Sequence, residues 1–396
     1  MLAIFLIVFV SMLGTSLLAP LIPFYAVRLG VTPEYITMIM ALYALCQFLA
    51  APFWGKISDT YGRKPVLMLT VAGTGAGFVL LGFADSVWLL ILSRIVGGIS
   101  AGNLSAAYAY VSDITTPENR SSGLGKIGAA FGLGFVLGPG IGGFLAGGDN
   151  ALDADFQRPA FAAAAMSVAA LVITALIMKE TRKLGEQAKA RATFNPLARF
   201  EVVTNSPGLL MTIGLMFLLT TSAAVRESTV ALWCHDQFSL DAREIGILFA
   251  YTGAVITVFQ GAAMGILSRR LGDANLLIVG IVAYAAGLTC FLFAENAPLL
   301  IIGTTFNAFG TAVFSNGPAT MASKLAKPAE RGLVLGINQS AGSLGRFFGP
   351  TFAGILYAQV SHTAPFALGI VGMIAGIAVA VVLKRRLAAL PEATHT

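Results

Sequence analysis

The chain contains twelve apolar runs, each about as long as a helix that crosses a lipid bilayer. A spanning helix needs about 20 predominantly apolar residues, and a backbone in lipid can satisfy its hydrogen bonds only within helices or closed barrels. Of the 396 residues, 57% are hydrophobic and 11% are charged, against about 25% charged residues in soluble domains. The sequence therefore predicts an all-α membrane protein with twelve transmembrane helices. The runs cover residues 2–27, 35–57, 66–83, 87–111, 122–147, 159–179, 207–234, 244–267, 275–294, 298–322, 333–358 and 364–383.

Lys and Arg are distributed unevenly over the loops, and this predicts the orientation of the chain. Positive residues near the ends of spans favour the cytoplasmic side. Of the 25 Lys and Arg residues, 19 fall in one set of loops, whereas only Arg28, Arg158 and Arg243 fall in the other. The first span lacks a charged leader and a small-residue cleavage site, so we expect it to be retained. Both termini are therefore predicted to be cytoplasmic, in a bacterial-type inner membrane, and the basic excess is a topology signal rather than a nucleic-acid footprint.

The two halves of the chain follow one plan. The charged turn "GKISDTYGRK" at 55–64 is answered 210 residues later by "GILSRRLGDA" at 265–274. The longest polar stretch separates six spans from six spans, which predicts an N-terminal six-helix bundle over 1–180, a cytoplasmic linker over 181–206, and a C-terminal six-helix bundle with a short tail over 207–396. Six-span repeats are typical of transporters, in which two similar bundles move about a site held between them.

The charges of the two turns are inverted. The residues that correspond are Asp59, Arg63 and Asp113 in the first half and Arg269, Asp273 and Lys324 in the second. Each half can form a cluster, with Arg63 between two acids and Asp273 between two bases. The two clusters would carry opposite net charge and attract each other. The alternative for both is a solvated turn that serves only topology.

The first turn resembles the signature of the loop between spans 2 and 3 in the major facilitator superfamily. Gly55, Asp59, Gly62, Arg63 and Lys64 stand where that family has them. The resemblance implies twelve helices in two pseudo-symmetric six-helix bundles around a central cavity. It also implies that the charged clusters hold the cytoplasmic side shut in the outward-facing state. The expected conformational gate comprises Gly55, Asp59, Gly62, Arg63, Lys64, Asp113, Arg269, Asp273 and Lys324.

Two further segments resemble motifs of the same family. "RIVGGISAG" at 94–102 resembles the span 4 motif, with Arg94 and Gly98 in place, and this implies a role for Arg94 in proton transfer; a buried structural pair is the alternative. A glycine-rich segment of span 5 resembles the motif of the antiporter branch, which implies export; plain helix packing is the alternative. Small residues and a proline let helices approach closely and bend. The motif residues are Gly134, Gly138, Pro139, Gly142 and Gly143.

Glu227 is the one acid that falls in the interior of a predicted span, whereas the other acids are assigned to the two sides of the membrane. It lies about twenty residues into span 7, beside Arg226. Ionisable residues inside a membrane commonly belong to proton relays or substrate paths, so the predicted proton-coupling residues are Glu227, Arg226 and Arg94. A structural Arg226–Glu227 pair, or a position at the periplasmic mouth of the span, is the alternative. Span 1 has no acid, although many drug:proton antiporters carry one there.

A set of polar and aromatic residues within spans predicts a substrate cavity. Arg346 lies about fourteen residues into span 11, and with Arg94 and Arg226 it gives the membrane interior three bases against one acid. Snorkelling to an interface is the alternative for Arg346, and bonding between neighbouring helices is the alternative for the uncharged residues. The predicted cavity residues are Arg346, Gln47, Asn103, Tyr43, Asn307, Asn316, Phe306 and Phe314.

The sequence contains no motif of an enzyme, a metal site or a cofactor site. The G-x-G-x-x-G spacing at 123–128 follows no strand, and no Walker lysine loop or H-E-x-x-H is present. The sequence therefore predicts a secondary efflux transporter that exports lipophilic small molecules by alternating access, in exchange for protons. An exporter or flippase of an anionic amphiphile and a membrane-embedded sensor are the alternatives. The expected partners are a small-molecule substrate, protons and the bilayer, with no nucleic acid, and we expect a monomer.

Overall fold

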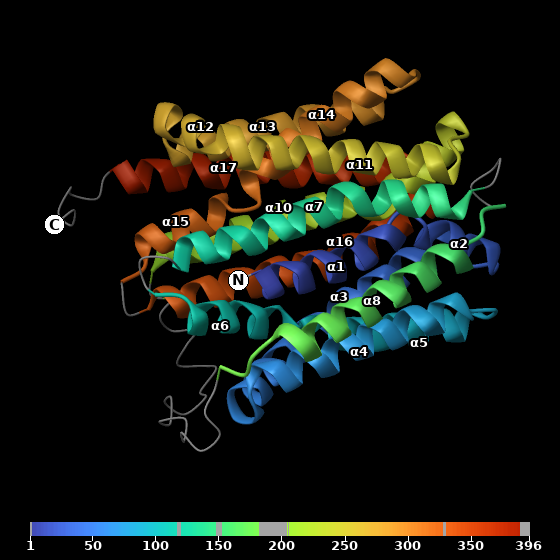
Figure 1. The fold of residues 1–396 in the computed structure, drawn as a ribbon. Helices are drawn as coiled ribbons and strands as arrows, with labels where there is room; N and C mark the ends of the chain where they lie inside the picture. The colour runs from blue at the N-terminus through green and yellow to red at the C-terminus, as the bar shows by residue number, and fades with distance from the viewer. Residues whose placement is uncertain are drawn as a thin grey trace. The chain divides into compact units, whose positions relative to one another are not determined.

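The computed structural model describes residues 2–116, 120–147, 153–181, 204, 206–327 and 330–388 (Figure 1). Helices follow one another throughout this part of the chain, in the order of the twelve predicted runs. The predicted all-α membrane fold is confirmed. The helices are α1 (Leu2–Leu18), α2 (Ile22–Arg28), α3 (Pro33–Tyr61), α4 (Arg63–Gly82), α5 (Val87–Ser100), η1 (Ala101–Asn103), α6 (Leu104–Ile114), α7 (Arg120–Ala146), α8 (Gln157–Ile177), α10 (Pro207–Phe238), α11 (Ala242–Val258), η2 (Phe259–Ala263), α12 (Met264–Leu271), α13 (Asp273–Leu292), α14 (Ala297–Phe314), α15 (Gly317–Leu325), α16 (Arg331–Gln359) and α17 (Ala364–Ala388).

Nine helices in the described part of the chain are long and apolar enough to span a membrane, or ten if α1 and α2 form one bent span. The bend between α1 and α2 is 40°, and it lies at Pro20, where a proline cannot continue the helix. The helix α16 does not meet the same hydropathy limit because it carries Asn338, Gln339 and Arg346. The fourth span is interrupted by η1, so that α5 is a shorter apolar helix.

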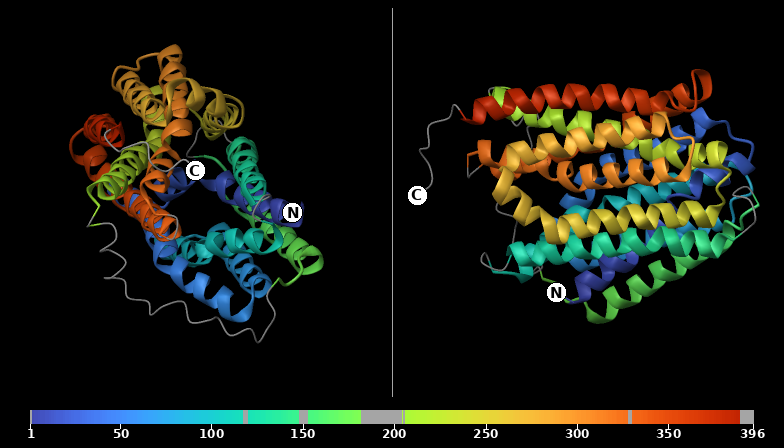
Figure 2. Two further views of the ribbon diagram at one scale, coloured as in Figure 1. Left: turned by 90° about the vertical axis from the view of Figure 1, so that its left-hand side faces the viewer. Right: turned by 90° about the horizontal axis from the view of Figure 1, so that it is seen from above.

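The contacts between helices repeat in the two halves of the chain. In the first half α4 packs against α5 and α8, and α1 packs against α7 and α8. In the second half α13 packs against α14 and α17 in the same way. Figure 2 shows these neighbouring helices from two further directions. The repeat of sequence is therefore also a repeat of packing.

By contacts between Cα atoms the chain divides into two compact units. The first comprises Met1–Arg191 and Ser228–Thr257, and the second comprises Ala192–Glu227 and Val258–Thr396. The segment Ser228–Thr257 joins the first unit because α11 packs closely on α7 at glycine residues. The bundle boundaries predicted at 180 and 207 stay a prediction.

Candidate functional site: two charged clusters and a group of buried charges

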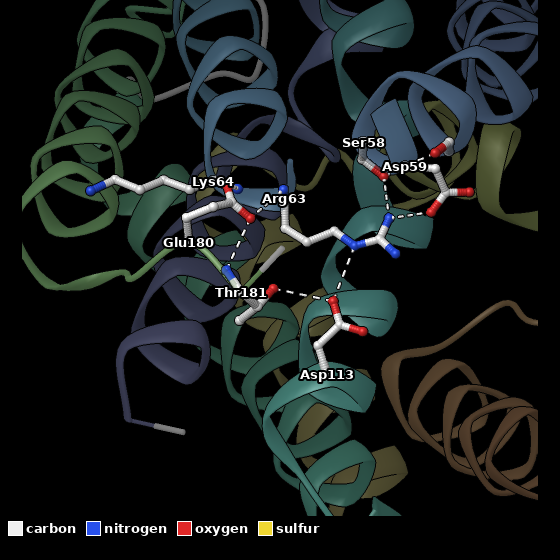
Figure 3. A network of polar contacts seen from close by, with 8 residues as sticks. Ser58, Asp59, Arg63, Lys64, Asp113, Glu180 and Thr181 are labelled. Atoms are coloured by element: carbon white, nitrogen blue, oxygen red, sulfur yellow. Dashed lines mark hydrogen bonds and ion pairs between the residues drawn. The ribbon is translucent and has the colours of Figure 1, made fainter. Parts of the chain in front are cut away.

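The first charged cluster lies where α3 ends and α4 begins (Figure 3). Arg63 is its centre: Nη1 lies 2.7 Å from Asp59 Oδ1, and Nε lies 3.2 Å from Asp113 Oδ2. The same Nη1 donates a hydrogen bond of 2.7 Å to the Ser58 hydroxyl, which in turn donates to the Gly55 carbonyl. The structure thus places one guanidinium between the two carboxylates.

The three charged members of this cluster differ in exposure. The side chain of Arg63 is 11% exposed, whereas those of Asp59 and Asp113 are 53% and 35% exposed. Exposed ion pairs contribute little to stability, because water and salt screen them. A nearly buried guanidinium with three acceptors is more costly to leave without partners. Arg63 is therefore the member on which the cluster depends most.

Glu180 is a fourth charged member, which the sequence analysis missed. Its Oε1 accepts a hydrogen bond of 3.0 Å from the Arg63 amide, and its Oε2 accepts one of 3.0 Å from the Lys64 amide (Figure 3). Glu180 follows α8, and the side chain of Lys64 also reaches this helix, donating 2.7 Å to the Ala175 carbonyl. A signal was present in the sequence: two bases open α4, and the N-terminus of a helix favours an acid.

The second cluster repeats the arrangement with the polarity reversed. Lys324 Nζ lies 2.6 Å from Asp273 Oδ2, and the Ser268 hydroxyl donates a short hydrogen bond to Asp273 Oδ1. Ser268 corresponds to Ser58, so the serine donates in one half and accepts in the other. The glycine before each central residue also corresponds: Gly62 has a φ of 103° and Gly272 has a φ of 75°.

Arg269 departs from the expected arrangement. The sequence pattern places Asp273 between two bases, yet Arg269 is exposed and forms no ion pair with any residue that the structure describes. Both carboxylate oxygens of Asp273 already have partners: Lys324 Nζ lies against Oδ2, and the Ser268 hydroxyl donates to Oδ1. Arg269, in the last turn of α12, stays exposed.

The glycine-rich segment of α7 lies directly against α1. A Cβ added to Gly134 would lie 2.8 Å from Met12 Cβ, and one added to Gly142 would overlap the carbonyl oxygen of Leu17. At Gly138 the Ser16 hydroxyl occupies the corresponding space. The glycines therefore let two backbones touch, and such close van der Waals packing stabilises helix–helix contacts in lipid. The same contact recurs between α16 and α10.

The other side of the α7 segment lies against α11. A Cβ added to Gly143 would lie 2.5 Å from the Ala242 carbonyl oxygen, and one added to Gly246 would lie 2.5 Å from the Pro139 carbonyl oxygen. A Cβ added to Gly253, about two turns further along α11, would lie 2.9 Å from the Phe135 carbonyl oxygen. The sequence analysis missed the α11 glycines, although their seven-residue spacing places both on one helix face.

Gly142→Ala should disrupt the contact between α7 and α1, whereas Gly140→Ala should not. The methyl group at 142 would meet the Leu17 backbone, which cannot move aside, whereas the methyl group at 140 would meet only Ala250 Cβ at 3.5 Å. Overpacking of this kind costs about 1–3 kcal/mol. We expect a lower Tm in detergent for Gly142→Ala and an unchanged or slightly higher Tm for Gly140→Ala. Equal Tm values would contradict the close contact.

Arg94 is buried within the first unit. Its side chain is 5% exposed, its Nε donates 3.4 Å to the Ser93 hydroxyl, and its guanidinium lies 5.7 Å from the centre of the Tyr43 ring. No acid pairs with it among the residues that the structure describes. A cation over an aromatic ring is stabilised by the ring quadrupole. Tyr43 is predicted to line the substrate cavity, and in the structure its ring contacts the Arg94 guanidinium.

Arg226 and Glu227 point in different directions although they are neighbours in the sequence. Arg226 is 6% exposed, donates 3.2 Å from Nε to the Tyr284 hydroxyl, and lies 5.9 Å from the centre of the Phe291 ring. Glu227 is exposed and makes no hydrogen bond or ion pair with any described residue. Successive residues of a helix point about 100° apart. Arg226 is thus anchored in the second unit by Tyr284.

Arg346 is the second base whose charge acts on Glu227. The carboxylate interacts electrostatically with Arg226 and Arg346, whereas Glu227 is the charged group that acts on Arg346. Arg346 is half-buried, and its Nη2 donates 3.1 Å to the Ser343 hydroxyl. A hydroxyl is a weak partner for a guanidinium, which prefers a carboxylate. Ser343 is thus the hydrogen-bond partner that the described residues give Arg346.

The remaining predicted cavity residues have contacts within their own units, and their convergence on one cavity stays a prediction. Gln47 donates 3.2 Å to the Ala101 carbonyl, and Asn307 is fully buried and donates 3.0 Å to the Gly303 carbonyl. Phe314 packs edge-on against Tyr284 with ring centres 5.1 Å apart, and Phe306 is 43% exposed. The side chain of Asn103 lies outside those described.

Asn316 is the predicted cavity residue that lines a cavity within one unit. The cavity has a volume of about 290 Å³ and lies between η2, α12, α13, α14 and α15. Its polar lining includes Gln260, Ser268 and Asp273. The π-helix η2 widens the backbone here, as such turns often do at functional sites. The cavity thus adjoins the second charged cluster.

Comparison with known families gives a match over almost the whole chain. The model of the Major Facilitator Superfamily matches residues 4–263 and 224–395. The two matched ranges overlap between 224 and 263.

Two bacterial relatives and one solved structure illustrate the similarity. Multidrug resistance protein 2 of Bacillus subtilis is 27% identical over 393 residues, which cover 96% of this chain and 94% of the relative. The class E tetracycline resistance protein of Escherichia coli is 30% identical over 296 residues, which cover 73% of this chain and 70% of the relative. The crystal structure of the human organic anion transporter superposes with a TM-score of 0.72 at 24% identity, over 96% of this chain and 98% of that one.

Proposed function

Since the chain belongs to the Major Facilitator Superfamily, we propose that it is a secondary active transporter that exports lipophilic, drug-like small molecules in exchange for protons. Export proceeds by alternating access of one binding site to the two sides of the membrane. The proposal places this multi-pass protein in a bacterial-type inner membrane, as a monomer with both termini in the cytoplasm. Its partners are the substrate, protons and the bilayer.

The feature that supports export is the glycine-rich segment of α7, which resembles the motif of the antiporter branch. This segment touches α1 on one side and α11 on the other. A helix held so closely on two sides can bend or slide as a unit. Relatives named for multidrug and tetracycline resistance support the same substrate class.

We assign the exchange of protons to Glu227. Among the described acids, it is the one that lies more than one turn from a helix end. The helix α10 has 32 residues, or about 48 Å of length, and Glu227 lies about 30 Å from its start at 1.5 Å per residue. A bilayer core about 30 Å thick, centred on this helix, contains that position. Approach and withdrawal of Arg346 would change the affinity of the carboxylate for a proton.

We assign closure of the predicted cytoplasmic side to the two charged clusters. Each cluster is complete within its own unit, because Arg63 has its acids and Asp273 has Lys324. Each cluster thus has its ion pairs within one unit. The opposite net charges predicted for the two clusters from the sequence would favour their mutual approach.

Proton release upon substrate binding tests this function in detergent solution. The protein is equilibrated in weakly buffered detergent, a lipophilic cation is added, and the pH is followed with a dye. We expect release of protons by a bound cation and none by a hydrophilic analogue. Tight binding of lipophilic cations without release of protons would contradict exchange at a shared site.

A second function is favoured by the three arginines that lie within predicted spans. An exporter or flippase of an anionic amphiphile needs a cation that can reach its substrate. Arg94 and Arg226 already contact Tyr43 and Tyr284 and are nearly buried, whereas Arg346 is half-buried. Arg346 is therefore the arginine suited to bind such a substrate.

Arg346→Gln separates the two functions, with Arg94→Gln as the matched variant. If the substrate is anionic, Arg346→Gln should weaken its binding about 10- to 100-fold, the worth of a hydrogen bond to a charged group. Arg94→Gln should change binding less, because Arg94 is 5% exposed. Competition binding with a cation and an anion of matched size measures both. Unchanged anion binding in Arg346→Gln would exclude this second function.

A further inference from the structure

The inversion of charge between the two halves creates an electrostatic difference at two helix starts. The first N–H groups of a helix lack partners within the helix and carry partial positive charge. The helix α13 begins with Asp273, an acid, whereas α4 begins with Arg63 and Lys64 and has no acid in its first turn. Two bases at this end of α4 are unfavourable. The first half therefore needs an anion from elsewhere in the chain.

Glu180 supplies that anion. Its two carboxylate oxygens accept one hydrogen bond each from the amides of Arg63 and Lys64, both of 3.0 Å. The carboxylate fits because residue 62 is glycine: a Cβ at this position would lie 2.5 Å from Glu180 Oε2. At Gly272, the corresponding position of the second half, a Cβ would meet no atom within 4 Å.

Thr181 extends the contact to the other side of the cluster. Its hydroxyl donates 3.1 Å to Asp113 Oδ2, the same oxygen that Arg63 Nε approaches (Figure 3). Two adjacent residues thus hold both ends of one ion pair: Glu180 holds the backbone of Arg63, and Thr181 holds the carboxylate of Asp113. Both residues stand directly after α8, where the polar connection between the two halves begins.

We propose that Glu180 and Thr181 form a clamp that keeps Arg63 aligned between Asp59 and Asp113, so that the start of the connection between the halves controls the charged gate. Both are positioning residues, since they act through Arg63 and Asp113. The inference rests on the gate role proposed above. The first charged cluster thus depends on residues that follow α8, whereas the second contains its own acid at the helix start, Asp273.

Two readouts test the clamp in the full-length protein. The first is hydrogen exchange of the peptide that contains the Arg63 and Lys64 amides. In Glu180→Ala these amides lose their acceptor, so their exchange rate should rise about three- to tenfold. In Glu180→Gln, which keeps one uncharged oxygen acceptor, the exchange rate should lie between that of Glu180→Ala and that of the native protein. Glu295→Ala removes an exposed acid before α14 and is the matched control.

The second readout is the population of the closed state, measured by spin labels at the exposed positions Thr60 and Leu271 in a background without the three native cysteines. Glu180→Ala and Thr181→Val should both shift the distances in the direction that Arg63→Gln does, and Thr181→Ser, which keeps the hydroxyl, should restore the native distances. Unchanged distances in Glu180→Ala, with a shift in Arg63→Gln, would overturn the clamp alone. Unchanged distances in both variants would overturn the gate and the clamp together.

Gly62→Ala and Gly272→Ala provide an independent comparison. Both positions have positive φ, which an alanine adopts only with strain, so the strain is shared. Only at Gly62 would the new methyl group also displace the Glu180 carboxylate. We expect faster exchange of the Arg63 and Lys64 amides in Gly62→Ala, and no further acceleration when Glu180→Ala is added. Additive effects would overturn the clamp.

Discussion

Glu227→Gln should abolish accumulation of substrate driven by a pH gradient, while leaving substrate binding and downhill exchange intact. Glutamine keeps the size and polarity of the side chain but cannot carry a proton. Since Glu227 is exposed and has no hydrogen-bond partner among the described residues, its loss should leave the packing of α10 unchanged. Uptake into proteoliposomes with an imposed pH difference measures the loss, and an unchanged Tm shows that the fold is retained.

Glu227→Asp and Glu295→Gln are the controls for this result. The aspartate keeps the carboxylate with a shorter reach, so we expect part of the activity. Glu295 is an exposed acid before α14, and its neutralisation should leave transport at the native level. A Glu227→Gln variant that still concentrates substrate under a pH difference would assign the carboxylate a structural role.

Arg63→Gln should shift the population strongly from the outward-facing to the inward-facing state. Its guanidinium is 11% exposed and contacts Asp59, Asp113 and Ser58, and loss of these three contacts, of which the one to Asp59 is partly screened by water, costs a few kcal/mol. A balanced two-state equilibrium responds to a few kcal/mol with a change of about a hundredfold or more. Spin-label distances between the predicted cytoplasmic ends of the two halves measure the shift.

Substitutions at different charged residues should shift the population by different amounts. Asp59→Asn should shift the population less than Arg63→Gln, because the Asp59 side chain is 53% exposed and its pair is screened. Arg270→Gln removes an exposed base of the second turn, for which the described residues provide no ion pair, and should have no effect. If Arg270→Gln shifted the population as much as Arg63→Gln, the shift would depend on net charge and not on the ion pairs of the cluster.

The fold could be predicted from the sequence because each span must satisfy its own backbone in lipid. The twelve apolar runs follow from that rule, whereas the bend between α1 and α2 at Pro20 is seen in the structure. The contact between α7 and α11 could not be predicted, because glycines report close packing without naming the partner helix. Gly143 and Gly246 are about a hundred residues apart and meet only in the folded chain.

The charged clusters were partly predictable, because repeated spacing aligns residues that occupy the same place in each half. The pairing of Arg63 with Asp59 and Asp113 agrees with the charge pattern. Arg269 makes no ion pair with a described residue, because Lys324 and Ser268 already occupy both oxygens of Asp273. The contact of Arg226 with Tyr284 was not predictable. Adjacency to Glu227 suggested an ion pair, but neighbours on a helix point to different sides.

Exchange of substrate for protons can be followed in proteoliposomes. Purified protein is reconstituted with a pH-sensitive dye inside the vesicles, and a lipophilic cation gradient is imposed across the membrane without a pH difference. We expect proton movement opposite to the substrate in the native protein and none in Glu227→Gln. Substrate movement at the native rate without any movement of protons would contradict the proposed exchange.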